Sequence, residues 1–416
     1  SKMIEKQFVP QIQRIVSSSL VLEGAPLHAL MDFIEKISEL RPDVSGNLLN
    51  SLTSNTSHEI ASVPNTARTI ARICLSVGCD VGPKVQTFIK SLHEESDVYT
   101  ISLLLHILGE IGRERNLASH SSLHIIVLEK FSHNSELVKK SAALCLGNIT
   151  VGSLSYYLPI VMEQMDNTRG DTYLVLTALR EIITCKANDL KVDEILPALL
   201  RHGSDSEEGA RNMVSECIGH LVRIDPKAVL TAIVHEAESE IPFSRAMAVS
   251  ALKFSISHVS EGNDNGEELR QILHPLIVRF LKLLTDNNVL VVEKTLITLN
   301  AIAHHEPSLL KHVFSSHSSN KNVNTMDIDS SRAVLMKLVH LLKKLVMQPL
   351  HFFSLIQITV MMTMMKRMTC RKVMMTIMML DMGDMRMMRE IYMIMRMSKK
   401  TLTILHGKFE NLLCLC

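Results

Sequence analysis

The chain has 416 residues, of which 46% are hydrophobic, 21% are charged and only 4% are aromatic, with no Trp. Gly and Pro are also scarce, with 16 and 12 residues. This composition favours an all-helical protein and argues against a β-sandwich or barrel. The formal net charge is +1. Residues 331–416 hold 14 Lys and Arg against 4 Asp and Glu, whereas residues 1–330 hold 30 against 39. Residues 1–330, which we call the body of the chain, are therefore acidic and lack the excess of basic residues that is typical of nucleic-acid-binding proteins.

The eight cysteines include no CxxC pair and form no disulfide framework. This usage is typical of a reducing compartment, so we expect a cytoplasmic location, a nuclear location or both. The first residues, SKMIEKQFVPQ, contain no signal peptide and look as if they were cut from a longer protein.

Six similar apolar segments follow one another along the body of the chain. They are LLLHILGEIG (103–112), SAALCLGNIT (141–150), LVLTALREII (174–183), VSECIGHLVR (214–223), VSALKFSISH (249–258) and LITLNAIAHH (296–305). Aligning Leu108, Leu146, Leu179, Ile218, Leu252 and Leu299 gives spacings of 38, 33, 39, 34 and 47 residues. A period near 35–40 residues is typical of HEAT or armadillo repeats.

Each repeat divides into two predicted helices. A first helix, such as 153–165 or 191–203, precedes a short polar turn, and a second helix such as 207–224 follows. Small residues on the second helices would let neighbouring repeats pack closely; these are Ala142, Ala143, Gly147, Ala178, Gly219 and Ala251. We predict an α-solenoid of about eight repeats over residues 1–314, a polar linker over 315–330 and an anomalous tail over 331–416.

The body contains no nucleotide-binding or catalytic motif, such as GxxxxGK[ST], GxGxxG or GxSxG. His120 and His124 have the i, i+4 spacing of a metal face, but no Glu lies between them. His106 lies in an apolar run and is best interpreted as a core or groove histidine. We therefore expect no enzyme activity, metal, cofactor or small-molecule substrate.

Long stretches of the body resemble a known family. They include SSSLVLEGAPLHALMDFIEKI (17–37), residues 103–165, SEEGARNMVSECIGHLVRIDPKAVL (206–230), FSRAMAVSALKFSIS (243–257) and AIAHHEPSLLKHVF (301–314). In this order they are similar to the C-terminal HEAT-repeat part of the cullin-associated and neddylation-dissociated (CAND) family. The resemblance covers residues 1–314 and stops near Phe314, although the family continues through further repeats.

The resemblance implies a binding function rather than a catalytic one. Members of the family are scaffolds that bind unneddylated cullin–RING ubiquitin ligase cores and promote the exchange of substrate-receptor modules, in competition with the adaptor and F-box protein. The family therefore implies a protein partner and a role in SCF complex assembly. The alternative from the repeats alone is another HEAT scaffold, such as a nuclear transport receptor or a phosphatase scaffold.

Charged residues near the second helices are the candidates for contact with a partner. They are Arg113, Lys139, Lys140, Arg180, Glu207, Glu208, Arg211, Arg245 and Lys294. Solenoids bind extended partners along one surface of the stacked repeats, and the sequence by itself does not select among these residues. Solvated surface charge remains the simpler interpretation for Lys139–Lys140 and Glu207–Glu208.

The tail has 16 Met in the 38 residues 360–397. A thioether site for Cu(I) and a membrane-associated segment over 345–365 are two interpretations, and the second is weakened by seven polar or Pro residues. The third rests on the genetic code. Read from the third base of ATG, Met–Met becomes GAT, which encodes Asp, so the tract translates into an acidic loop. We favour this out-of-frame origin and expect no independent fold there.

Overall fold

The structure is a computed structural model that describes residue 11 and residues 22–54, 62–76, 81–167, 172–186, 189–205, 207–257, 266–306 and 309. Every regular element in these ranges is a helix. The chain divides into two compact units, Ser1–Glu236 and Ala237–Cys416, which are described separately. Among the predicted domains, the linker at 315–330 and the tail at 331–416 lie outside the described residues.

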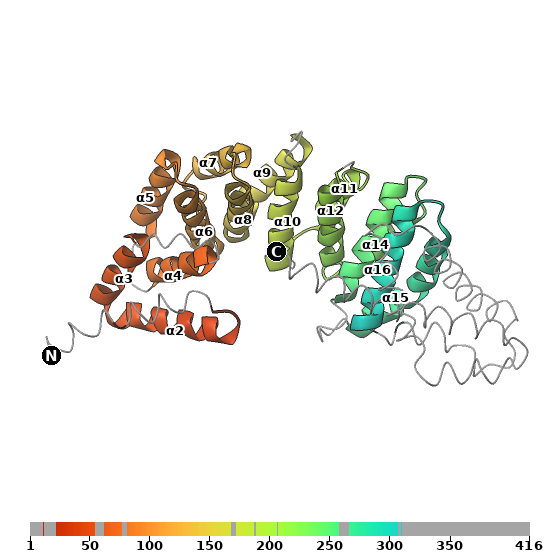
Figure 1. Ribbon diagram of the computed structural model, residues 1–416, viewed down its shortest axis with the longest axis horizontal. Coiled ribbons are helices and arrows are strands. Elements are labelled where there is room, and N and C mark those ends of the chain that lie inside the picture. Colours follow the sequence, from red (N-terminus) through yellow and green to blue (C-terminus); the bar gives the residue numbers. More distant parts are fainter. Residues whose placement is uncertain are drawn as a thin grey trace, which may run out of the picture. The chain divides into compact units, whose positions relative to one another are not determined.

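Unit 1 is a succession of helical hairpins (Figure 1). Its helices are α2 (Ala25–Leu40), α3 (Pro42–Ser54), α4 (Val63–Leu75), α5 (Val81–Glu94), α6 (Val98–Glu114), α7 (Leu123–Glu129), η2 (Lys130–Ser132), α8 (Glu136–Gly152), α9 (Leu154–Asn167), α10 (Thr172–Lys186), α11 (Val192–Arg201), α12 (Glu208–Leu221) and α13 (Pro226–Ala237). The hairpins α3–α4, α5–α6, α7–α8, α9–α10 and α11–α12 confirm the predicted arrangement of two helices per repeat.

The helices of unit 1 lie in two layers. Each second helix packs on the next along the series α2, α4, α6, α8, α10 and α12, while α5 contacts α7 and α9 contacts α11 in the other layer. In Figure 1 the second helices follow one another below α5, α7, α9 and α11. This stacking of hairpins is the α-solenoid that the sequence predicts.

The aligned apolar positions form the core between the layers. Leu108, Leu146, Leu179 and Ile218 are each 0% exposed. Burying a side chain of this size contributes about 1.5–3 kcal/mol relative to leaving it in water, so the repeated position stabilises every hairpin. The periodic pattern in the sequence therefore identified the core correctly.

In unit 1, two first helices contain a proline in their interior. Pro159 lies within α9 and Pro197 within α11. A proline in a helix removes one backbone hydrogen bond and bends the helix away from the missing bond. Both prolines lie in the first-helix layer of unit 1, and the second helices of the same two repeats, α10 and α12, contain no proline.

Glycines allow the second helices to approach one another closely. Gly112 on α6 meets Gly152 at the end of α8, and a Cβ placed on Gly152 would overlap the carbonyl oxygen of Gly112. A Cβ on Gly147 would lie 2.8 Å from the carbonyl oxygen of Ala178 on α10. Of the small residues predicted to permit close packing, Gly147 and Ala178 therefore lie at a contact between neighbouring repeats.

Unit 2 contains α14 (Pro242–Ser257), α15 (Gly266–Leu281), η4 (Lys282–Thr285) and α16 (Val289–His305). Helix α14 packs along α16, and their aligned positions Leu252 and Leu299 are 0% and 1% exposed. The Asn288 side chain accepts a hydrogen bond from the Leu290 N–H and so caps the start of α16.

Candidate partner-binding surface

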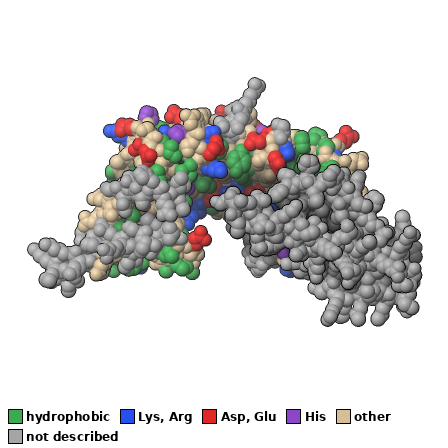
Figure 2. Space-filling view, in the orientation of Figure 1, with side chains coloured by type: hydrophobic (Ala, Val, Ile, Leu, Met, Phe, Trp, Pro, Cys, Tyr) green, Lys and Arg blue, Asp and Glu red, His purple; other side chains and the backbone are tan. Residues whose placement is uncertain are grey.

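The side of the second helices in unit 1 that faces away from the first-helix layer is the candidate binding surface, and we call it the second-helix face. It carries Arg68 and Arg72 from α4, His106, Glu110 and Arg113 from α6, Lys140 and Asn148 from α8, Arg180 and Glu181 from α10, and Glu216 and His220 from α12. Figure 2 shows acidic, basic and hydrophobic side chains interspersed on the side in view, rather than one patch of a single charge.

Arginines on this face pair with acids on the next second helix. Arg68 Nε lies 3.2 Å from Glu110 Oε1, which joins α4 to α6. Arg180 Nη1 lies 3.3 Å from Glu216 Oε1, which joins α10 to α12. Partly exposed pairs of this kind contribute little stability, about 0–1 kcal/mol each, but they fix the orientation of long side chains.

Arg113 makes a wider set of contacts than the other arginines of the face. Its Nε and Nη2 donate to Asn148 Oδ1 on α8 over 3.1 and 2.6 Å, and Nη2 also donates to Glu181 Oε1 on α10. The Arg113 side chain is 33% exposed and that of Glu181 is 19% exposed. Arg113 and Arg180, both predicted as partner-binding candidates, are thus engaged within the chain.

Glu216 is held in its ionised form by two neighbours. His220 Nε2 lies 3.8 Å from Glu216 Oε1, which is an ion-pair distance rather than a hydrogen bond, and Arg180 approaches the same oxygen. His220 and Arg180 hold the pKa of the Glu216 carboxyl below its ordinary value, although burial acts in the opposite direction. A negative charge is therefore fixed on α12.

His106 belongs to a buried polar group between α6 and α8. The hydroxyls of Ser102 and Ser141 lie 2.7 Å apart, and Ser141 Oγ lies 3.3 Å from His106 Nε2. Burial, with a smaller contribution from Arg68, lowers the pKa of His106 to about 4. The imidazole is consequently neutral at physiological pH, in agreement with its interpretation as a core or groove histidine.

The candidates on α8 differ in their surroundings. Lys139 Nζ lies 2.9 Å from Glu136 Oε1 one turn away on the same helix. Lys140 is exposed on the second-helix face. Lys140 therefore presents its ammonium group to a partner more directly than its neighbour does.

Three further candidates gather at the start of α12. Glu207 and Glu208 are exposed, whereas Arg211 is 8% exposed and its Nη1 donates to the Asp205 carbonyl over 2.6 Å. Asp205 Oδ1 in turn accepts from the Glu207 N–H at 3.1 Å. Arg211 thus holds the turn before the helix, while the two glutamates lie at its surface.

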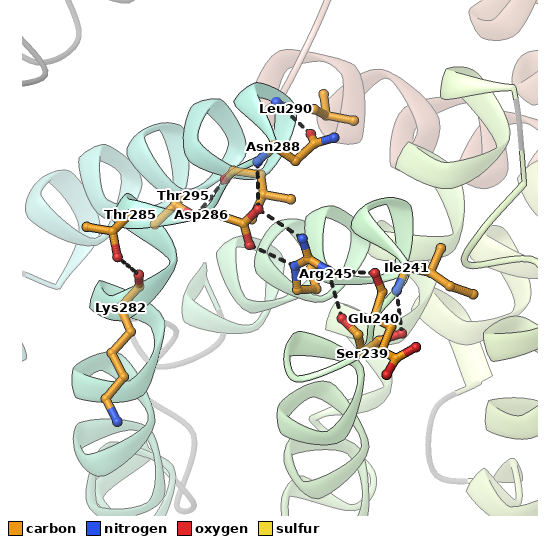
Figure 3. Close-up of polar contacts among 11 residues, drawn as sticks. Ser239, Glu240, Ile241, Arg245, Lys282, Thr285, Asp286, Asn288, Leu290 and Thr295 are labelled. Atoms are coloured by element: carbon orange, nitrogen blue, oxygen red, sulfur yellow. Dashed lines mark hydrogen bonds and ion pairs between the residues drawn. The ribbon is translucent and has the colours of Figure 1, made fainter.

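In unit 2, Arg245 is the centre of a polar cluster (Figure 3). Its guanidinium donates to both carboxylate oxygens of Asp286, over 2.8 and 2.9 Å, and to the carbonyls of Ser239 and Glu240. Arg245 is 16% exposed and Asp286 is 7% exposed. This geometry assigns Arg245 to holding the fold; Lys294, on α16, is half-buried.

The acidic and amide partners on the face were missed by the sequence reasoning, which selected mainly basic residues. They are Glu110, Asn148, Glu181 and Glu216. A usable signal was present, because Arg68 and Glu110 are 42 residues apart, Arg113 and Asn148 are 35 apart, and Arg180 and Glu216 are 36 apart. Each separation is close to one repeat.

Within the described ranges, no group of three His, Cys, Asp or Glu side chains is placed to hold a metal ion. His120 Nδ1 lies 3.3 Å from Gln86 Oε1, and the His124 ring packs edge-on against Tyr156 and Tyr157. In the same ranges, no helix has the length and hydropathy needed to cross a bilayer. The tail segments considered for copper or membrane binding lie outside the described residues.

Curated proteins similar to this chain are named as cullin-associated proteins. Cullin-associated NEDD8-dissociated protein 1 of Arabidopsis thaliana is 32% identical over 327 residues, and that of Dictyostelium discoideum is 33% identical over 325 residues. These alignments cover 75% and 74% of this chain but 26% of each relative. The chain therefore spans about a quarter of the length of these curated relatives.

A fungal relative from Emericella nidulans, named as the C-terminal part of the same protein, is 26% identical over 316 residues and covers 74% of this chain and 29% of its own length. No family model matches the chain. The solved structure of Kap95p with RanGDP covers 84% of this chain and 46% of its own, at 14% identity and a TM-score of 0.42, which is too low to carry an argument. From the curated relatives, the chain belongs to the cullin-associated NEDD8-dissociated (CAND) family and corresponds to its C-terminal part.

Proposed function

We propose that this chain is a non-catalytic scaffold that binds an unneddylated cullin–RING ubiquitin ligase core. The observation that supports it most directly is the 32–33% identity to cullin-associated proteins over three quarters of the chain. The stacked hairpins of unit 1 are compatible with this activity, since repeat arrays present one long surface to an extended partner. Such binding would take place in the cytoplasm, the nucleus or both.

We propose further that binding competes with the adaptor and F-box substrate receptor and so promotes their exchange. Two ligands that favour different states of one cullin lower each other's binding affinity by the same factor. That factor is limited by how much more tightly each ligand binds its favoured state. The array needs no catalytic group for this activity.

Capture experiments with the full 416-residue chain test the proposal. We expect the immobilised chain to retain an unneddylated cullin N-terminal region in complex with its RING protein, and to retain the neddylated form less. Equal retention of both forms, or retention of a small GTPase or a phosphatase subunit in place of the cullin, would contradict the proposed function.

A matched pair of lysine variants tests which face is used. Lys140→Glu changes an exposed cation on the second-helix face, and Lys90→Glu makes the same change at an exposed position on α5 in the other layer. Reversing a charge at an interface mainly slows association at low salt, by roughly tenfold. We expect this slower association with the cullin complex for Lys140→Glu alone. An equal loss in the two variants would exclude the second-helix face as the binding surface.

A further inference from the structure

One group of hydrogen bonds on the second-helix face connects three successive repeats. The Arg113 guanidinium, from the last turn of α6, donates to Asn148 on α8 and to Glu181 on α10. We call these three residues the Arg113 strap. In the described part of unit 1, the arginine–acid pairs Arg68–Glu110 and Arg180–Glu216 join only neighbouring second helices.

The strap constrains the separation of α6 and α10. Packed helices lie about 8–10 Å apart, so two helices on either side of a third are separated by roughly twice that distance in a flat layer. An extended arginine side chain is shorter than one such spacing. Together, the Arg113 and Glu181 side chains span the distance between α6 and α10, across Asn148 of α8.

Glycines on α6 and α8 keep neighbouring second helices close together at this contact. A Cβ on Gly147 of α8 would lie 2.9 Å from the Glu181 Cβ, and a Cβ on Gly109 of α6 would lie 3.3 Å from Asn148 Nδ2. Glycine at both positions leaves room for the strap between the helices. The strap and the close packing therefore support the same local arrangement.

We propose that the Arg113 strap is an ionic lock that holds α6 and α10 together on the second-helix face and that salt opens. The two charged side chains are 33% and 19% exposed, so mobile ions reach them. The Debye length falls from about 10 Å at 0.1 M salt to about 3 Å at 1 M, which weakens solvent-accessible pairs far more than buried ones. Opening the lock would let α6 and α10 separate on the face where a partner would lie.

Spin–spin distances in the full chain test the lock directly. Spin labels introduced through a noncanonical amino acid at Glu114 and Thr184, exposed positions near the ends of α6 and α10, report the separation of these helices. On raising salt to about 1 M, we expect the mean distance to increase by about 1–2 Å, the scale of helix shifts at packed interfaces, and its distribution to broaden.

The matched control is a substitution of Arg180, which precedes Glu181 of the strap in the sequence. Arg180 is 30% exposed and its partner Glu216 is 25% exposed, so Arg180→Gln removes a comparable pair that joins only neighbouring helices. We expect Arg113→Gln to be open at low salt and to respond no further to salt, while Arg180→Gln keeps the wild-type distance and salt response. The double variant Arg113→Glu/Glu181→Arg should restore the short distance.

Two results would overturn the lock. One is a wild-type distance that does not change with salt. The other is Arg113→Gln showing the wild-type distance and salt response. If Arg113→Gln fails to fold, as judged by far-ultraviolet circular dichroism, the wild-type salt titration and Glu181→Gln decide the question. Because no cullin is present in the experiment, its outcome is independent of the proposed function.

Discussion

At the scale of single residues, glycine determines how closely neighbouring repeats can pack. Gly152 ends α8 beside the last turn of α6, and the atoms around it belong to the backbone of Gly112 and Arg115. A backbone cannot rotate aside as a flexible side chain can. The position therefore excludes every other residue type for reasons of space, even though its own backbone is helical and permits any of them.

Replacing this glycine should destabilise α6 and α8 together. A Cβ at Gly152 would lie 2.9 Å from the Arg115 carbonyl oxygen and would overlap that of Gly112, so we expect Gly152→Ala to cost at least about 3 kcal/mol, the upper end for overpacking. Hydrogen exchange of the α6 and α8 amides, with urea unfolding, measures the loss.

The control for this prediction is Gly46→Ala on α3. Gly46 is exposed and has no atom within 4 Å of an added Cβ. Alanine is favoured over glycine inside a helix by about 0.5–1 kcal/mol, so this variant should be slightly more stable than the wild type. Equal destabilisation by the two substitutions would contradict the role given to Gly152.

At the scale of elements, one ion pair fixes the start of α16 against α14. Asp286 accepts two hydrogen bonds from Arg245 on α14 and one, at 2.8 Å, from the Asn288 N–H at the beginning of α16. Burial acts to raise the pKa of Asp286, but Arg245 and the Asn288 N–H outweigh it and hold the pKa below its ordinary value. The native state therefore favours the ionised carboxyl.

The pair makes unit 2 sensitive to acid. The pKa of Asp286 is lower in the native state than its ordinary value. The stabilisation that the ion pair gives to unit 2 is therefore complete at pH values above the ordinary Asp range, near 4, and is lost as the pH falls through the native pKa. We expect Asp286→Asn to destabilise unit 2 by roughly 3 kcal/mol at pH 7, because Arg245 loses its charged partner. The difference from the wild type should shrink toward pH 2, as measured by hydrogen exchange of α14 and α16.

An exposed pair provides the comparison. Lys191 and Glu194, at the start of α11, lie 2.9 Å apart with side chains that are 77% and 62% exposed. Glu194→Gln should leave the exchange rates of α11 unchanged. A loss as large as that of Asp286→Asn would mean that burial is not what gives the Arg245 pair its effect.

The helical hairpins could be predicted because their cause is local. Leu108, Leu146 and Leu179 recur at the repeat interval and are all fully buried, so periodicity alone identifies the core. The partners of Arg113 could not be predicted in the same way. Which acid Arg113 meets depends on how α6, α8 and α10 pack on one another, including the close approach at Gly147, and no spacing near Arg113 indicates this packing.

At the scale of the whole molecule, the repeats and the compact units divide the chain by different criteria. The sequence predicts one array of repeats over residues 1–314, and the boundary between the compact units falls between Glu236 and Ala237, within α13. Repeat periodicity does not report such a boundary, because each hairpin contacts mainly its neighbours and the pattern continues on both sides. The predicted boundary at residue 314 remains a prediction.

The coding sequence tests the origin of residues 331–416. If the Met-rich tract is out of frame, translation one base away across codons 353–411 should give a continuous acidic segment bracketed by ordinary repeat sequence. Sequencing of the transcript decides this. A stop codon in the shifted frame within these codons, or the absence of Asp and Glu runs, would contradict the out-of-frame interpretation.

The arginine–acid pairs of the second-helix face also bear on how such an array changes over evolution. Arg68 reaches Glu110 and Arg180 reaches Glu216 across separations of 42 and 36 residues, each close to one repeat. Duplication or loss of a whole repeat leaves an arginine one repeat away from an acid, so a pair of the same kind can form again. Duplication or loss of half a repeat, which is a single helix, would move second helices into the position of first helices. These arginine–acid pairs would then be buried. Unequal recombination between repeats is therefore tolerated only in whole steps.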